Sequence, residues 1–144
     1  RHPGKWDKIK NNIMKFVQLR TDHPHVTLKV SATCNPFNIY YLDELYDFFK
    51  EIDVPIDIHL IQIPECYDIR ILPDSVKQAI TEKHKHREDL SHVLTFLNSK
   101  MNNAELYLKD FLYITKGTDK IRKEKFGDVM PEFDAVLRKN GINI

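Results

Sequence analysis

The stretch Val26-Thr27-Leu28-Lys29-Val30-Ser31-Ala32-Thr33 decides the fold class of this chain. Its side chains alternate between apolar and polar, which is typical of a β-strand. The apolar face carries Val26, Leu28, Val30 and Ala32, and the polar face carries Thr27, Lys29, Ser31 and Thr33. Two interpretations of the polar face are open. Either it lines a barrel interior that binds a polar ligand, because a lysine and hydroxyls are costly on a covered face, or it is the exposed face of an open sheet.

Helical and extended patterns flank this strand. Apolar side chains recur at helical spacing over Lys5–Leu19 and again over Ile39–Ile52, with Asn38 as the expected N-cap of the second helix. Ile56–Ile63 alternates like a second strand, with Asp57 and His59 on its polar side. The order strand, helix, strand predicts two parallel strands joined by a right-handed crossover. Two strands do not make a stable sheet alone, so we expect the chain to be part of a longer barrel or to associate with a copy.

The second half of the sequence is predicted to be helical. The patterns indicate helices over Val76–Lys83, Leu90–Asn98, Ala104–Ile114 and Pro131–Leu137, with Gly117 at a helix end. We therefore expect an α/β fold. Residues 1–72 would form part of a (βα) barrel, with two parallel strands and crossover helices, and residues 73–144 a mainly helical C-terminal region.

Composition narrows the function classes. The chain has 144 residues, 42% hydrophobic and 30% charged, with a net charge of +1. This balance gives no field that would attract nucleic acid or a membrane surface, and the apolar runs are far shorter than the roughly 20 residues of a transmembrane helix. The short basic run Lys120–Lys125 is expected to be a solvated face. The two cysteines do not form a disulfide framework, so we expect a reducing, cytoplasmic location.

Several segments, in this order, resemble the C-terminal part of a radical S-adenosylmethionine (radical SAM) enzyme. In order, they are similar to a crossover helix, to a strand with its loop and helix, and to a late barrel strand of that family. The last two are similar to an "LPxxxK" helix start and to a "DxxR…F…PE" motif near the C-terminus. Phage and bacterial members of the family with a Twitch-like C-terminal region carry this last motif. These segments are Trp6–Arg20, Leu28-Lys29-Val30-Ser31-Ala32-Thr33 with Asn38-Ile39, His59–Leu72, Leu72-Pro73…Val76-Lys77 and Thr118-Asp119-Lys120-Ile121-Arg122…Phe126…Pro131-Glu132.

The resemblance implies a ligand site at the carboxyl ends of the strands. S-adenosylmethionine would contact Ser31, Thr33, Gln62 and Ile63, and an unknown small-molecule or peptide substrate would contact Lys29, Asn35 and His59. Each residue also has a simpler role. Lys29 can be a solvated strand lysine and His59 an exposed or core histidine.

The chain departs from the family at its iron–sulfur site. The CxxxCxxC loop that holds the 4Fe–4S cluster is absent, and Cys34 and Cys66 lie too far apart to replace it. With His59 they would make only an incomplete soft-metal site, so no metal site is assigned to this chain. The first hypothesis is a fragment of a radical SAM enzyme, inactive alone, whose missing N-terminal barrel half supplies the cluster. The alternative is a small non-catalytic α/β binding or assembly module that pairs through its sheet edge.

Overall fold

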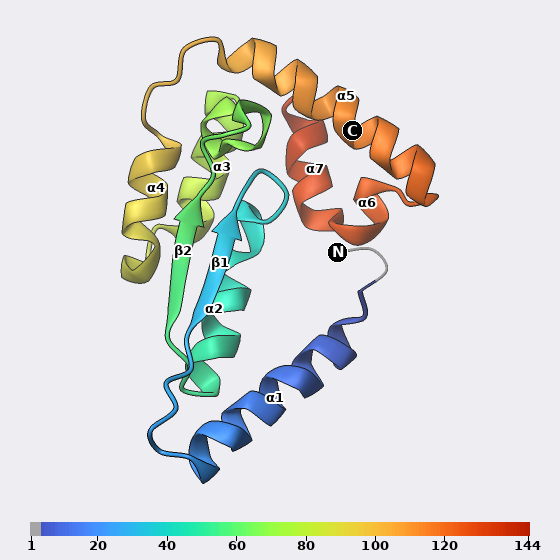
Figure 1. The fold of residues 1–144 in the computed structure, drawn as a ribbon. Helices are drawn as coiled ribbons and strands as arrows, with labels where there is room; N and C mark the ends of the chain where they lie inside the picture. Colours follow the sequence, from blue (N-terminus) through green and yellow to red (C-terminus); the bar gives the residue numbers. More distant parts are fainter. Residues whose placement is uncertain (1–3) are drawn as a thin grey trace.

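The structure, a computed structural model, describes residues 4–144 and is drawn in Figure 1. It is a mixed α/β fold in which helices predominate around a small parallel sheet. Short 3-10 turns at Ile39–Tyr41, Glu65–Tyr67, Ile69–Ile71 and Glu88–Leu90 connect the elements. The helices and strands are α1 (Trp6–Asp22), β1 (Val30–Cys34), α2 (Leu42–Glu51), β2 (Ile56–Leu60), α3 (Asp74–His84), α4 (Ser91–Leu97), α5 (Ala104–Arg122), α6 (Phe126–Val129) and α7 (Pro131–Lys139).

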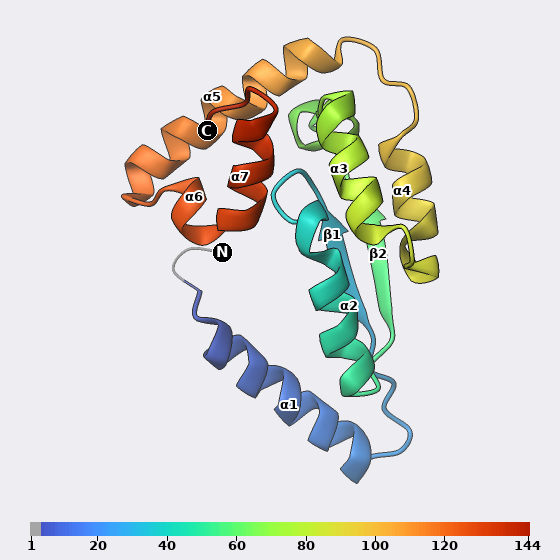
Figure 2. The same ribbon diagram turned by 180° about the vertical axis from the view of Figure 1, so that it is seen from behind.

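The sheet confirms the predicted parallel pair. β1 and β2 lie in register, with Val30 opposite Ile56 and Cys34 opposite Leu60. In Figure 2, α2 lies in front of the sheet and β2 to the right of β1, which is the right-handed crossover. Within the described residues the sheet has two strands, so these residues form an open sheet and close no barrel.

α2 forms and docks because its sequence satisfies both the helix and the sheet. Leu42, Leu45 and Phe49 recur on one side of the helix, and Leu42 and Phe49 are buried. Acidic residues in its first turn and a lysine in its last turn complement the helix dipole. α2 therefore covers the apolar face of the sheet and leaves the opposite face free.

The main core joins both halves of the chain. Side chains from β1, the segment after it and α2 pack with side chains from α3, α4, α6 and α7 in one hydrophobic cluster. Each large side chain fully buried there contributes about 1.5–3 kcal/mol. Residues of this cluster include Cys34, Ile39, Leu42, Val76, Ile80, Val93, Leu97, Phe126, Phe133 and Leu137.

A smaller cluster fastens α5 to the body of the protein. Phe111 is 2% exposed and groups with Cys66 and Ile71. Its ring lies 4.9 Å from that of Phe37, which follows β1, and Phe37 also lies 6.2 Å from Phe126. These aromatic contacts tie the end of β1 to the C-terminal helices.

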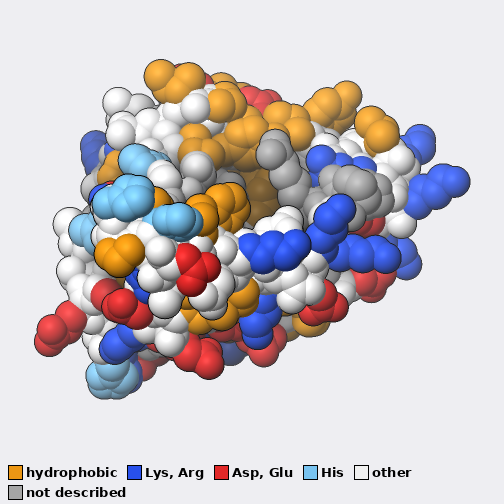
Figure 3. Space-filling model, turned by 60° about the horizontal axis from the view of Figure 1, so that its bottom comes forward, with side chains coloured by type: hydrophobic (Ala, Val, Ile, Leu, Met, Phe, Trp, Pro, Cys, Tyr) orange, Lys and Arg blue, Asp and Glu red, His pale blue; other side chains and the backbone are white. Residues whose placement is uncertain are grey.

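α1 is confirmed as a helix but is loosely attached. It projects away from the body, on the same side of the sheet as α2 (Figures 1 and 2), and none of its residues is buried. Trp6 packs on Phe48 of α2 with ring centroids 5.2 Å apart, and Arg20 donates a 2.6 Å hydrogen bond to the carbonyl of Asp53. In Figure 3, hydrophobic side chains gather around a hollow on the face of the molecule that includes α1.

Two expectations about the helix ends were wrong. α5 does not end near Gly117 but continues to Arg122, and Lys123 ends it in the left-handed conformation with φ 56°. Near this end the Asp119 carbonyl accepts the hydrogen bond of the C-cap, and the Asp119 carboxylate accepts a 2.8 Å hydrogen bond from the amide of Phe126, the first residue of α6. Asn38 does not cap a helix, since its side chain bonds to the loop before it instead.

Candidate functional site

The candidate site is the polar outer face of the sheet. Strand alternation places Lys29, Ser31 and Thr33 on this face from the β1 side, and Asp57 and His59 from β2, and all five residues are exposed. The register sets Ser31 beside Asp57 and Thr33 beside His59. The structure thus brings four of the seven predicted ligand residues onto one surface and adds Asp57, which the sequence had placed on the polar side of β2.

Lys29 forms an ion pair with Asp57 across the two strands. Their side chains are 54% and 52% exposed, so the pair contributes at most about 1 kcal/mol. The ammonium can therefore exchange this partner for the anionic group of a ligand at small cost.

The loop after β1 uses Asn35 for its own structure. The Asn35 side-chain oxygen accepts a 2.9 Å hydrogen bond from the amide of Phe37, and the Asn35 amide donates a 2.9 Å bond to the Asn38 side chain. Asn38 in turn donates a 2.8 Å bond to the carbonyl of Thr33. These bonds hold the carboxyl end of β1 in a fixed turn, so Asn35 is half-buried and already engaged as an acceptor.

Gln62 and Ile63 follow β2 at the same end of the sheet. The last hydrogen bond of the strand pair, 3.3 Å from the Ile61 amide to the Cys34 carbonyl, comes just before them. Both are exposed, with Ile63 at 83%, and a cis peptide bond joins Ile63 to Pro64. Because parallel strands end at one edge, these residues share that edge with Asn35.

The cysteines do not form a metal site. Cys34 is buried in the main cluster and Cys66 in the smaller one. Burial, aided by the charge of Asp68, raises the pKa of Cys34 to about 12, and burial also raises the pKa of Cys66. No group of three metal-ligating side chains occurs in residues 4–144. The described residues therefore do not fit a 4Fe–4S cluster, and we derive no reaction step through one.

A partly buried charged pair beside a buried histidine, between α2 and α3, is absent from the sequence-based predictions. Asp43 on α2 accepts a 2.5 Å hydrogen bond from Lys83, and Nδ1 of His84 lies 3.9 Å from the same carboxylate oxygen. Burial opposes ionisation of Asp43, but the hydrogen bond and charge of Lys83, together with His84, lower its pKa below the usual value. The pair joins two helices, and His84 is 1% exposed.

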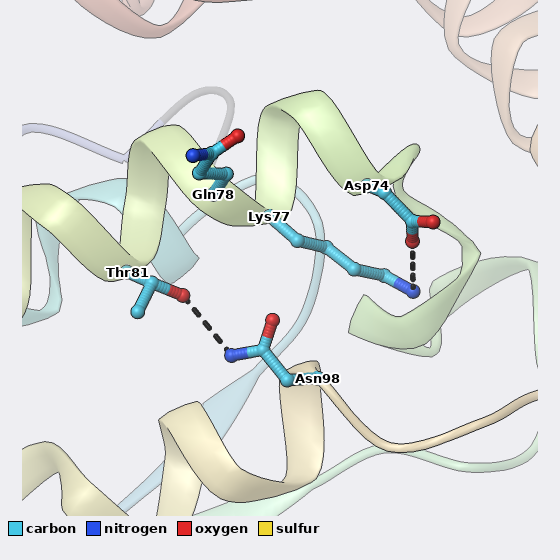
Figure 4. A pocket seen from close by; sticks show the side chains of 5 residues that line it. All are labelled: Asp74, Lys77, Gln78, Thr81 and Asn98. Atoms are coloured by element: carbon cyan, nitrogen blue, oxygen red, sulfur yellow. Dashed lines mark hydrogen bonds and ion pairs between the residues drawn. The ribbon is translucent and has the colours of Figure 1, made fainter.

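Polar side chains also line a groove between α3 and the end of α4, shown in Figure 4. Its volume is about 450 Å³. No motif in the sequence indicated it, because it forms only when the two helices pack. The lining residues are Asp74, Lys77, Gln78, Thr81 and Asn98.

Comparison with known proteins does not add a function. No protein-family model matches the chain. No curated protein and no solved structure matches it either. Among residues 4–144 there is also no helix with the length and apolarity needed to cross a bilayer.

Proposed function

We propose that this chain is one wall of an α/β barrel in a radical SAM enzyme, with the polar face of β1 and β2 turned toward the barrel interior. The observation that carries this proposal is a polar strand face in a sheet whose two edges have no partner strand among residues 4–144. Polar groups on a covered face are favourable only where they meet a polar ligand. In a complete barrel the exposed face would become such an interior.

The free edges follow from the hydrogen-bond pattern. The amide of Val30 bonds to the carbonyl of Pro55, and the carbonyl of Cys34 accepts from Ile61, so alternate backbone groups of β1 face β2. The amides of Ser31 and Thr33 consequently point to the outer edge, where no backbone partner occurs in the described part of the chain. Further strands would pair there, and their helices would cover the exposed apolar side chains of α1.

The proposed roles divide along the strands. Ser31 and Thr33 would bond to S-adenosylmethionine, while Gln62 and Ile63 at the carboxyl end would lie against its adenine. Lys29 and His59 would face a small-molecule or peptide substrate, and Asn35 would shape the rim that it already stabilises. The reaction class is radical hydrogen abstraction in a cytoplasmic enzyme. The cluster ligands would come from the rest of the barrel, so this chain alone is expected to be inactive.

The test is a titration of the ¹⁵N-labelled chain with S-adenosylmethionine, followed by two-dimensional NMR. We expect saturable shifts at Ser31, Thr33, Gln62 and Ile63, and none at Thr27, an exposed residue that precedes the start of β1. Thr33→Ala should weaken binding, and the matched control Thr27→Ala should not. Absence of saturable shifts, or shifts confined to another surface, would contradict the proposal. Sequencing the reading frame upstream for CxxxCxxC is an independent check.

A second candidate function is assembly through the sheet edge, which the same unpaired edges favour. Ser31→Pro removes an outward amide and leaves the bonds to β2 in place. If copies pair through β1, sedimentation should show a dimer that this substitution dissociates. A monomer at all concentrations would argue against assembly and leave the barrel proposal intact.

A further inference from the structure

We propose that the groove between α3 and α4 binds a carboxylate that has an N–H group beside it, the chemistry shared by free α-amino acids and peptide C-termini. The groove belongs to helices on the covered side of the sheet and contains none of the strand residues assigned above. It is thus a second site, and its evidence is independent of the barrel proposal.

Lys77 supplies the cation of this site. The residue is only 9% exposed, and its one ionic partner in the described chain is Asp74, with Nζ and Oδ1 3.7 Å apart. This separation is too long for a hydrogen bond. The buried stem of Lys77 holds the ammonium at the groove, where an anion would accept the charge-assisted hydrogen bonds that Asp74 is too distant to accept.

Neutral groups around Lys77 complement the rest of the ligand. Asn98 donates its two amide hydrogens to Thr81 at 3.0 Å and to the carbonyl of Leu94 at 2.8 Å. Its side-chain oxygen remains an acceptor for an N–H group, and the Thr81 hydroxyl keeps its own hydrogen to donate. The exposed amide of Gln78 can donate and accept. Figure 4 shows Thr81 and Asn98 facing each other across the groove, with Lys77 reaching along it.

The charge of the groove selects a carboxylate over a phosphate. Asp74 and Lys77 together carry no net charge, so a dianion would meet one cation and one repelling carboxylate. A monoanion needs only the Lys77 ammonium, and the N–H group next to it can use the side-chain oxygen of Asn98 as its acceptor. The groove volume of about 450 Å³ also exceeds what a single small anion fills.

The experiment uses N-acetylglycine as probe, read by two-dimensional NMR on the ¹⁵N-labelled chain. We expect saturable shifts of the Gln78 and Asn98 side-chain amides, with an affinity on the order of 1 mM for so open a groove. N-acetylglycinamide, which lacks the carboxylate, should give no saturable shift there. Comparison with free glycine identifies the source, since stronger binding of N-acetylglycine indicates a peptide C-terminus and stronger binding of glycine a free amino acid.

Two substitutions with opposite expected effects keep the test decisive. Lys77→Met retains the apolar stem but removes the charge, and should weaken binding by about tenfold. Asp74→Asn removes the competing carboxylate, and should tighten binding by about threefold. Lys109→Met, an exposed lysine on α5, is the matched control and should change nothing. The proposal is overturned if the probe and its amide shift the same signals equally, if inorganic phosphate binds more tightly, or if neither groove variant changes the affinity.

Discussion

Replacing His84 by leucine is expected to remove most of the pH dependence of folding stability between about pH 7 and pH 5. His84 is 1% exposed, and within the described residues neither ring nitrogen has a hydrogen-bond partner of good geometry. Burial lowers the pKa of His84, although the Asp43 carboxylate and the nearby backbone of Ile39 act in the opposite direction. The folded protein therefore keeps the ring neutral at pH values where the unfolded chain protonates it.

The magnitude follows from proton linkage. An unfolded histidine has a pKa of about 6.5, and above this pH neither state binds the proton. As the pH falls below it, only the unfolded chain is protonated, so stability is lost by up to about 1.4 kcal/mol per pH unit until the folded-state pKa is reached. The lowered pKa values of Asp43 and Asp89 act mainly below about pH 4, outside this window.

The assay is urea unfolding followed by circular dichroism at about pH 7.5, 6.5 and 5.5. Wild type should lose up to about 1 kcal/mol between the last two values from this residue, and His84→Leu should lose far less. His86→Leu, an exposed neighbour on the same segment, is the control and should keep the wild-type slope. The reasoning is refuted if His84→Leu retains the full pH dependence or if His86→Leu abolishes it.

Three further outcomes are expected. Phe111→Ala should lower the free energy of unfolding in urea by about 3–5 kcal/mol because the ring is buried. Tyr113→Ala, at a residue of the same helix that is 82% exposed, should change it by less than about 0.5 kcal/mol. Equal effects would contradict the packing described. Ellman's reagent at mildly alkaline pH should react slowly with Cys34 and Cys66 in the folded protein and rapidly after unfolding, since burial raises both pKa values; fast native labelling of Cys34 would refute this. Hydrogen exchange should be faster in α1 than in α2, because α1 buries no residue; equal protection would mean that α1 is packed.

The sequence correctly predicted which side chains of the strands share a face, but it overestimated the length of the strands. Alternation is a local property, so the polar and apolar sides of Val26–Thr33 were readable from the sequence. The observed strand begins only at Val30, because β2 starts at Ile56 and the described residues provide no partner strand opposite Val26 or Leu28. The first and last residues of a strand depend on where its partner strand begins and ends, and the sequence of one strand does not contain that information.

The site was predictable to a similar extent. Lys29, Ser31, Thr33 and His59 share a face because both strands alternate and run parallel, which the strand–helix–strand order already indicated. The contact between Asp43 and His84 was not predictable, since it depends on how α2 and α3 pack. The groove at Lys77 and Asn98 depends in the same way on the packing of α3 against α4.

The hydrophobic cluster that joins β1 and α2 to α7 cannot form until residues far apart in the sequence have all been synthesised on the ribosome. Ile39 and Leu42 are synthesised first, and Phe133 and Leu137, which share their cluster, are added roughly 90 residues later. At about 5–20 residues per second, the early apolar side chains wait on the order of ten seconds for their last partners. During that interval the nascent chain presents an uncovered apolar surface to chaperones, and the cluster is completed only after Leu137 has been added.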